Sequence, residues 1–238
     1  MIPTHAGALM PHGGDPYFDS VVYLHHFDAI ATPTIFTDVQ GNVWSQTGAV
    51  GNSLQQLDSV GQPPKFLPAC GYFANDTGGN PVLDFNYPDF DLDETGENKF
   101  TLECWMVPGP NGVLGVGFTT PLSDVLLTVQ NRNPVRVTGQ FSTGIFSVSG
   151  GLLAGGVWSF IEGNYDGTYI RVFVNGVMVS KSAVAPGTPL QVSSAKIGMF
   201  SASPGDYLYM DDARFTRAKC RHPSDASYSV PTRAFPNF

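Results

Sequence analysis

Hydrophobic residues along this chain recur mostly in short runs or at every second position, which is the spacing that β-strands produce. Residues 98–108 show the alternation most clearly. The side chains expected on the apolar face of this strand are Phe100, Leu102, Cys104 and Met106. The opposite face takes Thr101, Glu103 and Trp105. The pattern predicts a strand in which Cys104 is a small core residue rather than a reactive thiol.

Further segments rich in β-branched and aromatic residues are separated by turns at intervals of about 8–12 residues. They comprise residues 20–27, 34–38, 124–130, 134–140, 144–149, 157–165, 168–174, 177–182, 195–201 and 207–215. Asn175-Gly176 is the strongest hairpin signal, because a type I′ turn requires positive φ at both central residues. No long window shows helical spacing. The sequence therefore predicts an all-β, antiparallel, two-sheet β-sandwich.

The length of 238 residues fits one domain, since β-sandwiches of this size are common as single domains. Residues 1–16 are rich in proline and glycine and are expected to form an extended N-terminal arm. Residues 17–238 form the sandwich domain with a proline-rich C-terminal tail. The arm must be held by a partner subunit or by its own domain. The residues that we expect in an assembly contact are Met1, Ile2 and Pro3.

Charged residues make up only 13% of the chain, so uncharged polar side chains and turn backbone must cover much of the surface. Such a surface suits contact with protein subunits or sugars, and it equally suits a β protein with long polar loops. The net charge of -8 argues against nucleic acid as a partner, because phosphate binding requires a basic surface. The sequence shows neither a membrane span nor a secretory leader, so we expect a soluble protein that folds in a reducing cytoplasm.

Cysteine and histidine spacing predicts neither a disulfide framework nor a zinc site. The cysteines are odd in number and widely spaced, although a single Cys70–Cys220 bridge stays open as an alternative. His25 and His26 are adjacent in a predicted strand and point to opposite faces, so they cannot share one metal ion.

Two groups of acidic residues are candidate calcium ligands. Residues 89–94 have alternating acids but lack the glycine and glutamate that an EF-hand requires, so a short strand with its acids in water is the simpler prediction. In residues 211–214, Asp212 and Arg214 are expected on one face and Asp211 on the other, which predicts an Asp–Arg pair or backbone hydrogen bonds. A site made of Asp28, Asp211 and Asp212 leaves calcium open as the only cofactor.

Five segments resemble, in the same order, the laminin G-like jelly-roll domains of the concanavalin A-like type that occur in bacteriophage structural proteins. They are residues 15–28, 100–108, 158–176, 209–216 and 228–237. The chain departs from the family at Cys104, where an aromatic residue is expected, and in an irregular stretch from Gly41 to Gly79. The resemblance implies two curved sheets that serve as a structural part of a phage particle or as an appendage that contacts host polysaccharide.

Catalysis is not expected. Family-16 glycoside hydrolases on the same sandwich place alternate carboxylates along one strand as nucleophile and acid. None of the glutamates fits that pattern; they are Glu94, Glu97, Glu103 and Glu162.

Candidate binding residues are tryptophans and a local basic run. Trp44, Trp105 and Trp158 would stack on sugar rings if exposed; Trp105 is favoured because it lies opposite the apolar face of its strand, and packing against a loop or the second sheet is the alternative. The basic residues expected at an assembly contact with an acidic neighbour, or else at a solvated strand end, are Arg217, Lys219 and Arg221.

The leading hypothesis is therefore a bacteriophage virion structural protein, as a capsid-decoration (cement) or tail-accessory subunit located in the virion. It would contact other virion proteins and form a small homo-oligomer, with no nucleic-acid or membrane partner and no enzymatic activity. The alternative hypothesis is a carbohydrate-binding adhesin or receptor-binding protein that recognises host surface glycans.

Overall fold

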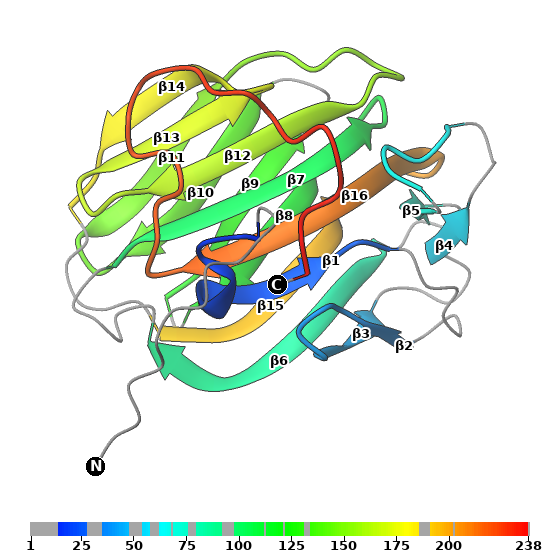
Figure 1. Cartoon of the computed structure of the whole chain (residues 1–238), viewed down its shortest axis with the longest axis horizontal. Coiled ribbons are helices and arrows are strands. Elements are labelled where there is room, and N and C mark those ends of the chain that lie inside the picture. Colours follow the sequence, from blue (N-terminus) through cyan, green and yellow to red (C-terminus); the bar gives the residue numbers. More distant parts are fainter. Residues whose placement is uncertain are drawn as a thin grey trace.

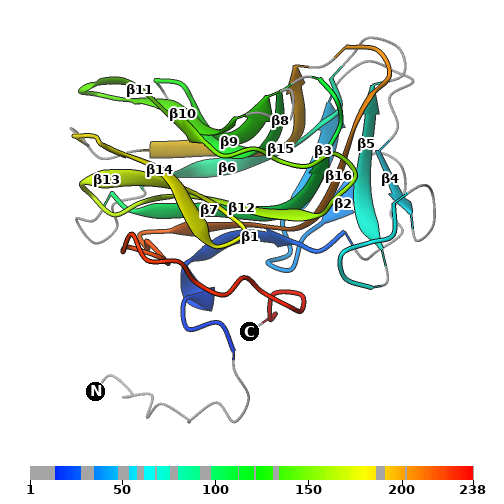
Figure 2. The ribbon, with the colours of Figure 1, turned by 90° about the horizontal axis from the view of Figure 1, so that it is seen from above.

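The computed structural model describes residues 14–27, 35–47, 54–57, 62–67, 69–75, 80–91, 98–111, 113–120, 122–130, 134–185, 191–201 and 203–237. Within these ranges the chain forms strands, turns and one short 3-10 helix, η1 (Phe18–Ser20). Every strand pairing is antiparallel, and the strands form two sheets stacked face to face. The all-β, two-sheet sandwich expected from the hydrophobic pattern is confirmed (Figures 1 and 2).

The first sheet is eight-stranded. Its strands in spatial order are β14 (Val177–Ala183), β13 (Tyr169–Val174), β12 (Ser159–Tyr165), β7 (Phe100–Pro108), β16 (Asp206–Arg217), β5 (Cys70–Asn75) and β4 (Leu54–Leu57). The eighth strand, β1 (Val21–His25), also pairs with β16. Because β5 pairs with the first half of β16 and β1 with the second half, both lie along the same edge of that long strand.

The second sheet is also eight-stranded. Its strands in spatial order are β11 (Gly144–Gly150), β10 (Val135–Phe141), β9 (Asp124–Gln130), β8 (Val113–Thr119), β15 (Gln191–Ser201), β6 (Val82–Asp91), β3 (Val43–Thr47) and β2 (Ile35–Thr37). The edge strands of the two sheets, β14 and β11, approach each other at one end of the sandwich, where a Cβ on Gly150 would lie 2.6 Å from the Val179 carbonyl oxygen.

The sequence pattern misses β8, which contains two glycines, and the strands β3, β4 and β5 in the irregular stretch. In β8, Gly115 and Gly117 interrupt the apolar run, but both allow β8 to lie close to β9. A Cβ added to Gly115 would lie 2.0 Å from the Leu127 oxygen, and one added to Gly117 would lie 2.4 Å from the Val125 oxygen. The stretch from Gly41 to Gly79 holds β3, β4 and β5, which obtain their register from long-range partners. Local pattern alone does not reveal such strands.

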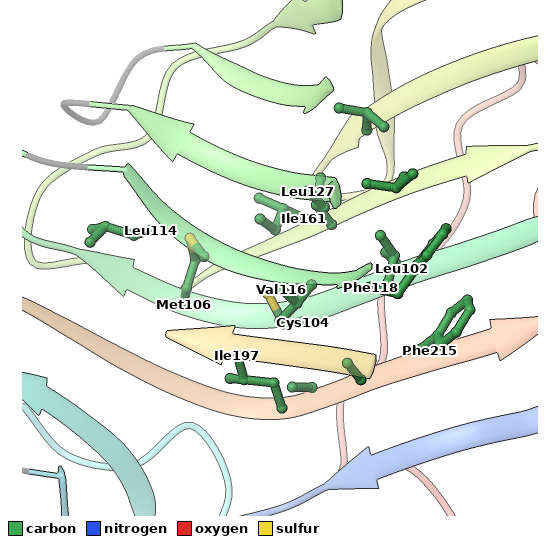
Figure 3. Packing of buried hydrophobic residues seen from close by; sticks show 14 of the residues in the cluster. Leu102, Cys104, Met106, Leu114, Val116, Phe118, Leu127, Ile161, Ile197 and Phe215 are labelled. Atoms are coloured by element: carbon green, nitrogen blue, oxygen red, sulfur yellow. The ribbon is translucent and has the colours of Figure 1, made fainter. Parts of the chain in front are cut away.

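The main core lies between the two sheets, and the alternation of β7 sets its centre. All four residues predicted for the apolar face of this strand are fully buried there, including Cys104 (Figure 3). Aromatic rings fill one end, where Phe118 of β8 stacks on Phe215 of β16 at a centroid distance of 4.8 Å. The three cysteines are free, so the alternative of a Cys70–Cys220 bridge is wrong.

A β-bulge in β16 changes the expected direction of its acidic residues. Asp211 is paired with Trp105 and Arg214 with Glu103, so two residues of β16 oppose one residue of β7. Asp212 lies in the bulge with a φ of 46°. The prediction that Asp211 faces away from Asp212 and Arg214 is wrong. The extra residue of the bulge shifts the alternation of β16, so the carboxylates of Asp211 and Asp212 and the guanidinium of Arg214 all lie on the outer side of the first sheet.

Two segments cover that outer side. The N-terminal segment (residues 14–20) and the C-terminal strap (residues 218–237) cross the face of the first sheet that points away from the second sheet (Figure 2). A second apolar cluster lies beneath them and contains Val21, Leu24, Trp105, Phe160 and Phe235. The strap has no regular secondary structure, so individual side-chain and backbone contacts with the sheet hold it in place.

Candidate functional site

The outer face of the first sheet carries a pocket of about 440 Å³ between the N-terminal segment and the C-terminal strap. Glu103 of β7, Phe160 of β12 and Arg214 of β16 form its floor, because each projects from a strand of the sheet. Residues 14–17 line one side, and strap residues 221–222 and 228–236 line the other. The pocket therefore forms only where the two ends of the described chain meet over the sheet.

Two arginines and two carboxylates form a closed ion-pair network in the pocket. Arg214 donates to Asp15 Oδ2 at 2.8 Å and to Glu103 Oε1 at 2.7 Å. Arg221 donates to both oxygens of Asp15, at 2.8 and 2.6 Å, and its Nε lies 3.4 Å from Glu103 Oε2. Their side chains are between 2% and 8% exposed. The network joins β7, β16, the N-terminal segment and the strap.

The charges of this network are mutually stabilised. Burial by itself would raise the pKa of Asp15, but the hydrogen bond from Arg221 and the charges of Arg221 and Arg214 outweigh it and lower the pKa below its ordinary value. Burial likewise opposes the charged form of Arg221, and the carboxylates of Glu103 and Asp15 raise its pKa in spite of it. Asp15 and Arg221 are therefore both charged at neutral pH and stabilise each other's charge.

A second network ties the strap to β12. Glu162 is fully buried and its Oε2 lies 2.6 Å from both His222 Nδ1 and the Tyr228 hydroxyl, while Asn164 donates to its Oε1. The His222 and Tyr228 rings stack in parallel at a centroid distance of 3.5 Å. Burial, followed by the Glu162 charge, raises the pKa of Tyr228, so its hydroxyl stays protonated and donates to Glu162.

The carboxylates of Asp211 and Asp212 accept hydrogen bonds from backbone amides, which argues against the metal site suggested for them. Asp212 accepts from the Phe235 amide at 2.7 Å and contacts His26, while Asp211 accepts from the Phe66 amide at 2.9 Å. Asp28 lies outside the described residues. Within the described part of the chain, no group of three or more His, Cys, Asp or Glu side chains is arranged to hold a metal ion.

The predicted tryptophans do not line the pocket. Trp44 is fully buried between the sheets and donates its indole N–H to Asp38 Oδ2 at 3.0 Å, so it has no free face for a sugar. Trp105 is 4% exposed and packs on Phe66, so the alternative that it packs against a loop is the correct one. Its ring is covered by Lys65, whose Nζ lies 3.8 Å from the ring centroid. Trp158 is half-buried and donates to the Pro63 oxygen at 2.8 Å.

The predicted assembly residues are divided by the structure. Met1, Ile2 and Pro3 lie outside the described residues. Arg221 is drawn into the pocket network and is not a free docking group. Lys219 lines a separate polar hollow, and its carbonyl oxygen accepts from Thr101. Arg217 ends β16 and is half-buried. These residues therefore do not form one exposed basic patch.

Tyr17 is the aromatic side chain that sequence reasoning missed. It lines the pocket and is 37% exposed. Asp15 fixes its backbone by accepting from the Tyr17 amide at 2.9 Å, and the Arg221 guanidinium lies 5.3 Å from the ring centroid. The Asp15-Pro16 turn in front of the first strand was an available signal, because aspartate and proline favour such turns.

Two glutamates on neighbouring strands also come together. Glu103 of β7 and Glu162 of β12 are directly paired in register, although the chain has no strand with alternating carboxylates. Glu103 bonds to Arg214, and Glu162 bonds to Asn164, His222 and Tyr228. Both are buried and engaged, so the pair serves the hydrogen-bond network that holds the strap.

A protein-family model matches more than half of this chain. The model of the concanavalin A-like lectin/glucanases superfamily, of the laminin G type, matches residues 78–214. No curated protein matches the chain by sequence. Among the described residues, no helix has the length and apolar character needed to cross a membrane.

Solved structures share the fold at low sequence identity. The binding domain of paraclostridial mosquitocidal protein 1 matches with a TM-score of 0.61 and 10% identity, over 84% of this chain and 49% of that one. The binding domain of botulinum neurotoxin DC in complex with SialylT gives a TM-score of 0.58 and 12% identity, over 85% and 48%. A third structure is of botulinum neurotoxin type C, a toxin whose cell entry depends on interaction with two ganglioside molecules. It matches with a TM-score of 0.58 and 14% identity, over 85% of this chain and 49% of that one. The chain spans about half the length of each.

Proposed function

Because the chain belongs to the concanavalin A-like lectin/glucanases superfamily, we propose that it is a non-catalytic glycan-binding module whose ligand occupies the pocket over the first sheet. This function corresponds to the adhesin hypothesis drawn from the sequence. Structures with the same fold include toxin binding domains, one of them in complex with SialylT, which makes recognition of a glycan a reasonable expectation for this sandwich.

The observation that carries the proposal is the combination of an exposed aromatic ring with a fixed polar floor in one pocket. Tyr17 offers a ring face at the rim, where the apolar C–H face of a sugar would pack. Glu103 and Arg214 form a polar floor below it and are held in position by Asp15 and Arg221. A few convergent polar groups beside an aromatic surface are typical of small-molecule sites.

The absence of catalysis is part of this proposal. A glycosidase needs one carboxyl group free to protonate the leaving group and a second free to attack or to activate water. Glu103 is bonded to Arg214, and Glu162 is bonded to His222 and Tyr228. We therefore expect no hydrolysis of any glycan that the protein binds.

The test is a glycan array followed by calorimetry with the best ligand. Replacing Tyr17 by alanine removes the exposed ring, so Tyr17→Ala is expected to raise the dissociation constant by about tenfold or more. The matched control is Leu122→Ala, because Leu122 is exposed in the turn before β9 and does not line the pocket. Failure to bind any glycan on the array would contradict the proposal.

A second candidate is a structural subunit of a bacteriophage particle, located in the virion as a capsid-decoration or tail-accessory protein. The observation that favours a protein contact is a set of exposed aliphatic side chains near the edge strands β11 and β14: Ile145, Leu152, Val157 and Val177. Exposed apolar side chains of this kind suit an interface with neighbouring subunits or with a second copy of the chain. Mass spectrometry of purified particles tests it, and absence of the protein from them would exclude this candidate.

A further inference from the structure

The charge arrangement of the pocket bears on which class of glycan it accepts. We infer that the pocket takes an uncharged sugar residue and discriminates against sialylated or other carboxylate-bearing sugars. This inference rests on the proposed function and narrows its ligand. It also sets this chain apart from the neurotoxin structures that contain SialylT or depend on gangliosides.

The first argument is that the arginine of the floor, Arg214, and the arginine of the wall, Arg221, are already paired with carboxylates. Arg214 is bonded to Asp15 and Glu103, and Arg221 is bonded to Asp15, with distances of 2.6 to 2.8 Å. These groups are almost completely buried, so solvent screens their charges weakly. A ligand carboxylate would have to displace Asp15 or Glu103 from an arginine and would be repelled by the displaced group.

The second argument concerns the hydrogen-bonding capacity that the network leaves unused. Glu103 Oε2 and Arg214 Nε have no hydrogen-bond partner among the described residues, and both residues line the pocket. Glu103 and Arg214 are 1% and 5% exposed, so a small movement of the wall is needed to reach these two atoms. One is an acceptor and the other a donor. A hydroxyl group can donate to an acceptor such as Glu103 Oε2 or accept from a donor such as Arg214 Nε, whereas a carboxylate only accepts hydrogen bonds.

The rim of the pocket contains an exposed cation, which favours the opposite outcome. Arg233 lines the pocket and is exposed. An exposed guanidinium is well hydrated and contributes little to binding a ligand charge, in contrast to a cation inside a closed site. The other exposed rim residues are uncharged and include Tyr17, Ser229 and Thr232. The rim and floor together therefore suit hydroxyl groups and a C–H face.

The experiment uses an array that carries neutral oligosaccharides beside their sialylated counterparts, followed by titration calorimetry on the best matched pair. We expect the neutral member to bind at least about tenfold more tightly. Its affinity should change by less than about twofold between about 0.05 and 0.5 M NaCl, because no net charge is neutralised on binding. Tyr17→Ala should weaken binding, and Leu122→Ala should leave it unchanged.

The outcomes separate this inference from the proposed function. Tighter binding of the sialylated member, with a strong salt dependence and loss of binding in Arg233→Ala, would overturn the neutral-sugar inference and leave glycan binding intact. Binding that survives Tyr17→Ala would place the glycan outside this pocket and overturn the inference as well. Binding of neither member, across the whole array, would remove the proposed function together with the inference.

Discussion

At the scale of single residues, buried charge on the outer face depends on partners that are distant in the chain. Glu162 is fully buried in β12, and its partners His222 and Tyr228 belong to the strap. A carboxylate in such a position is stable only when its oxygens accept hydrogen bonds. These contacts therefore explain both why the strap lies over β12 and why Glu162 tolerates burial.

Removing one of these donors should loosen the strap. Tyr228→Phe deletes the hydroxyl that lies 2.6 Å from Glu162 Oε2 while it keeps the ring stacked on His222. We expect the free energy of unfolding to fall by about 1–3 kcal/mol, because a buried acceptor loses a donor. Urea denaturation measures the change. Tyr207→Phe, which removes a hydroxyl outside this network, is the control, and an equal loss in both variants would contradict the assignment.

At the scale of elements, the hairpin between β13 and β14 is both a local turn and a docking point for the strap. Asn175 and Gly176 have φ values of 51° and 76°, as the sequence pattern required. The Gly176 carbonyl oxygen also accepts from the Tyr228 amide at 2.9 Å. An added Cβ on Gly176 would lie 2.1 Å from the Tyr228 oxygen, so the turn has no room for a side chain beneath the strap.

Two glycines with similar backbone angles separate these two roles. Gly176→Ala introduces backbone strain and a clash with the strap, whereas Gly205→Ala introduces strain alone, since nothing lies within 4 Å of the added Cβ at a φ of 86°. We expect about 1 kcal/mol of destabilisation for Gly205→Ala and at least about twice that for Gly176→Ala. Thermal unfolding and limited proteolysis of the strap are the measurements. Equal effects would show that the strap contact is unimportant.

At the scale of the whole molecule, the sandwich buries a histidine that must remain neutral. His25 ends β1, stacks on Phe27 at a centroid distance of 4.0 Å and accepts the Phe27 amide proton at Nδ1. Burial, with a smaller contribution from the nearby His26 charge, lowers the pKa of His25 from 6.5 to about 3. Between these two pH values the unfolded chain binds a proton that the folded protein does not.

Folding stability should therefore decrease as the pH falls through this window. His25 is expected to contribute a loss of about 1.5 kcal/mol in the free energy of unfolding from pH 6.5 to about pH 5. His25→Asn keeps an acceptor near the position of Nδ1 and removes the titrating group. Urea denaturation at several pH values should show a shallower pH dependence in the variant than in the natural protein. Identical slopes would rule out His25 as the titrating group.

The candidate binding residues were predicted less well than the fold. The pattern favoured tryptophans for sugar stacking, but Trp44 and Trp105 lie in apolar clusters, and the exposed ring belongs to Tyr17. The alternation of β7 placed Trp105 on the outer face correctly, yet it contained no information about what covers that face. Phe66 and Lys65, which precede β7 in the chain, cover Trp105, and the strap, which follows β16, lies over the same face (Figure 2).

The sandwich follows from the sequence pattern, because alternation and turn chemistry are local properties. This pattern predicts the apolar face of β7, the Asn175-Gly176 hairpin and the burial of Cys104. The pocket, in contrast, depends on long-range contacts. Asp15 and Arg221 are 206 residues apart, and they meet over Glu103 and Arg214 because the two segments cross one face of the first sheet. Such contacts depend on the packing of distant segments, which short-range spacing does not encode.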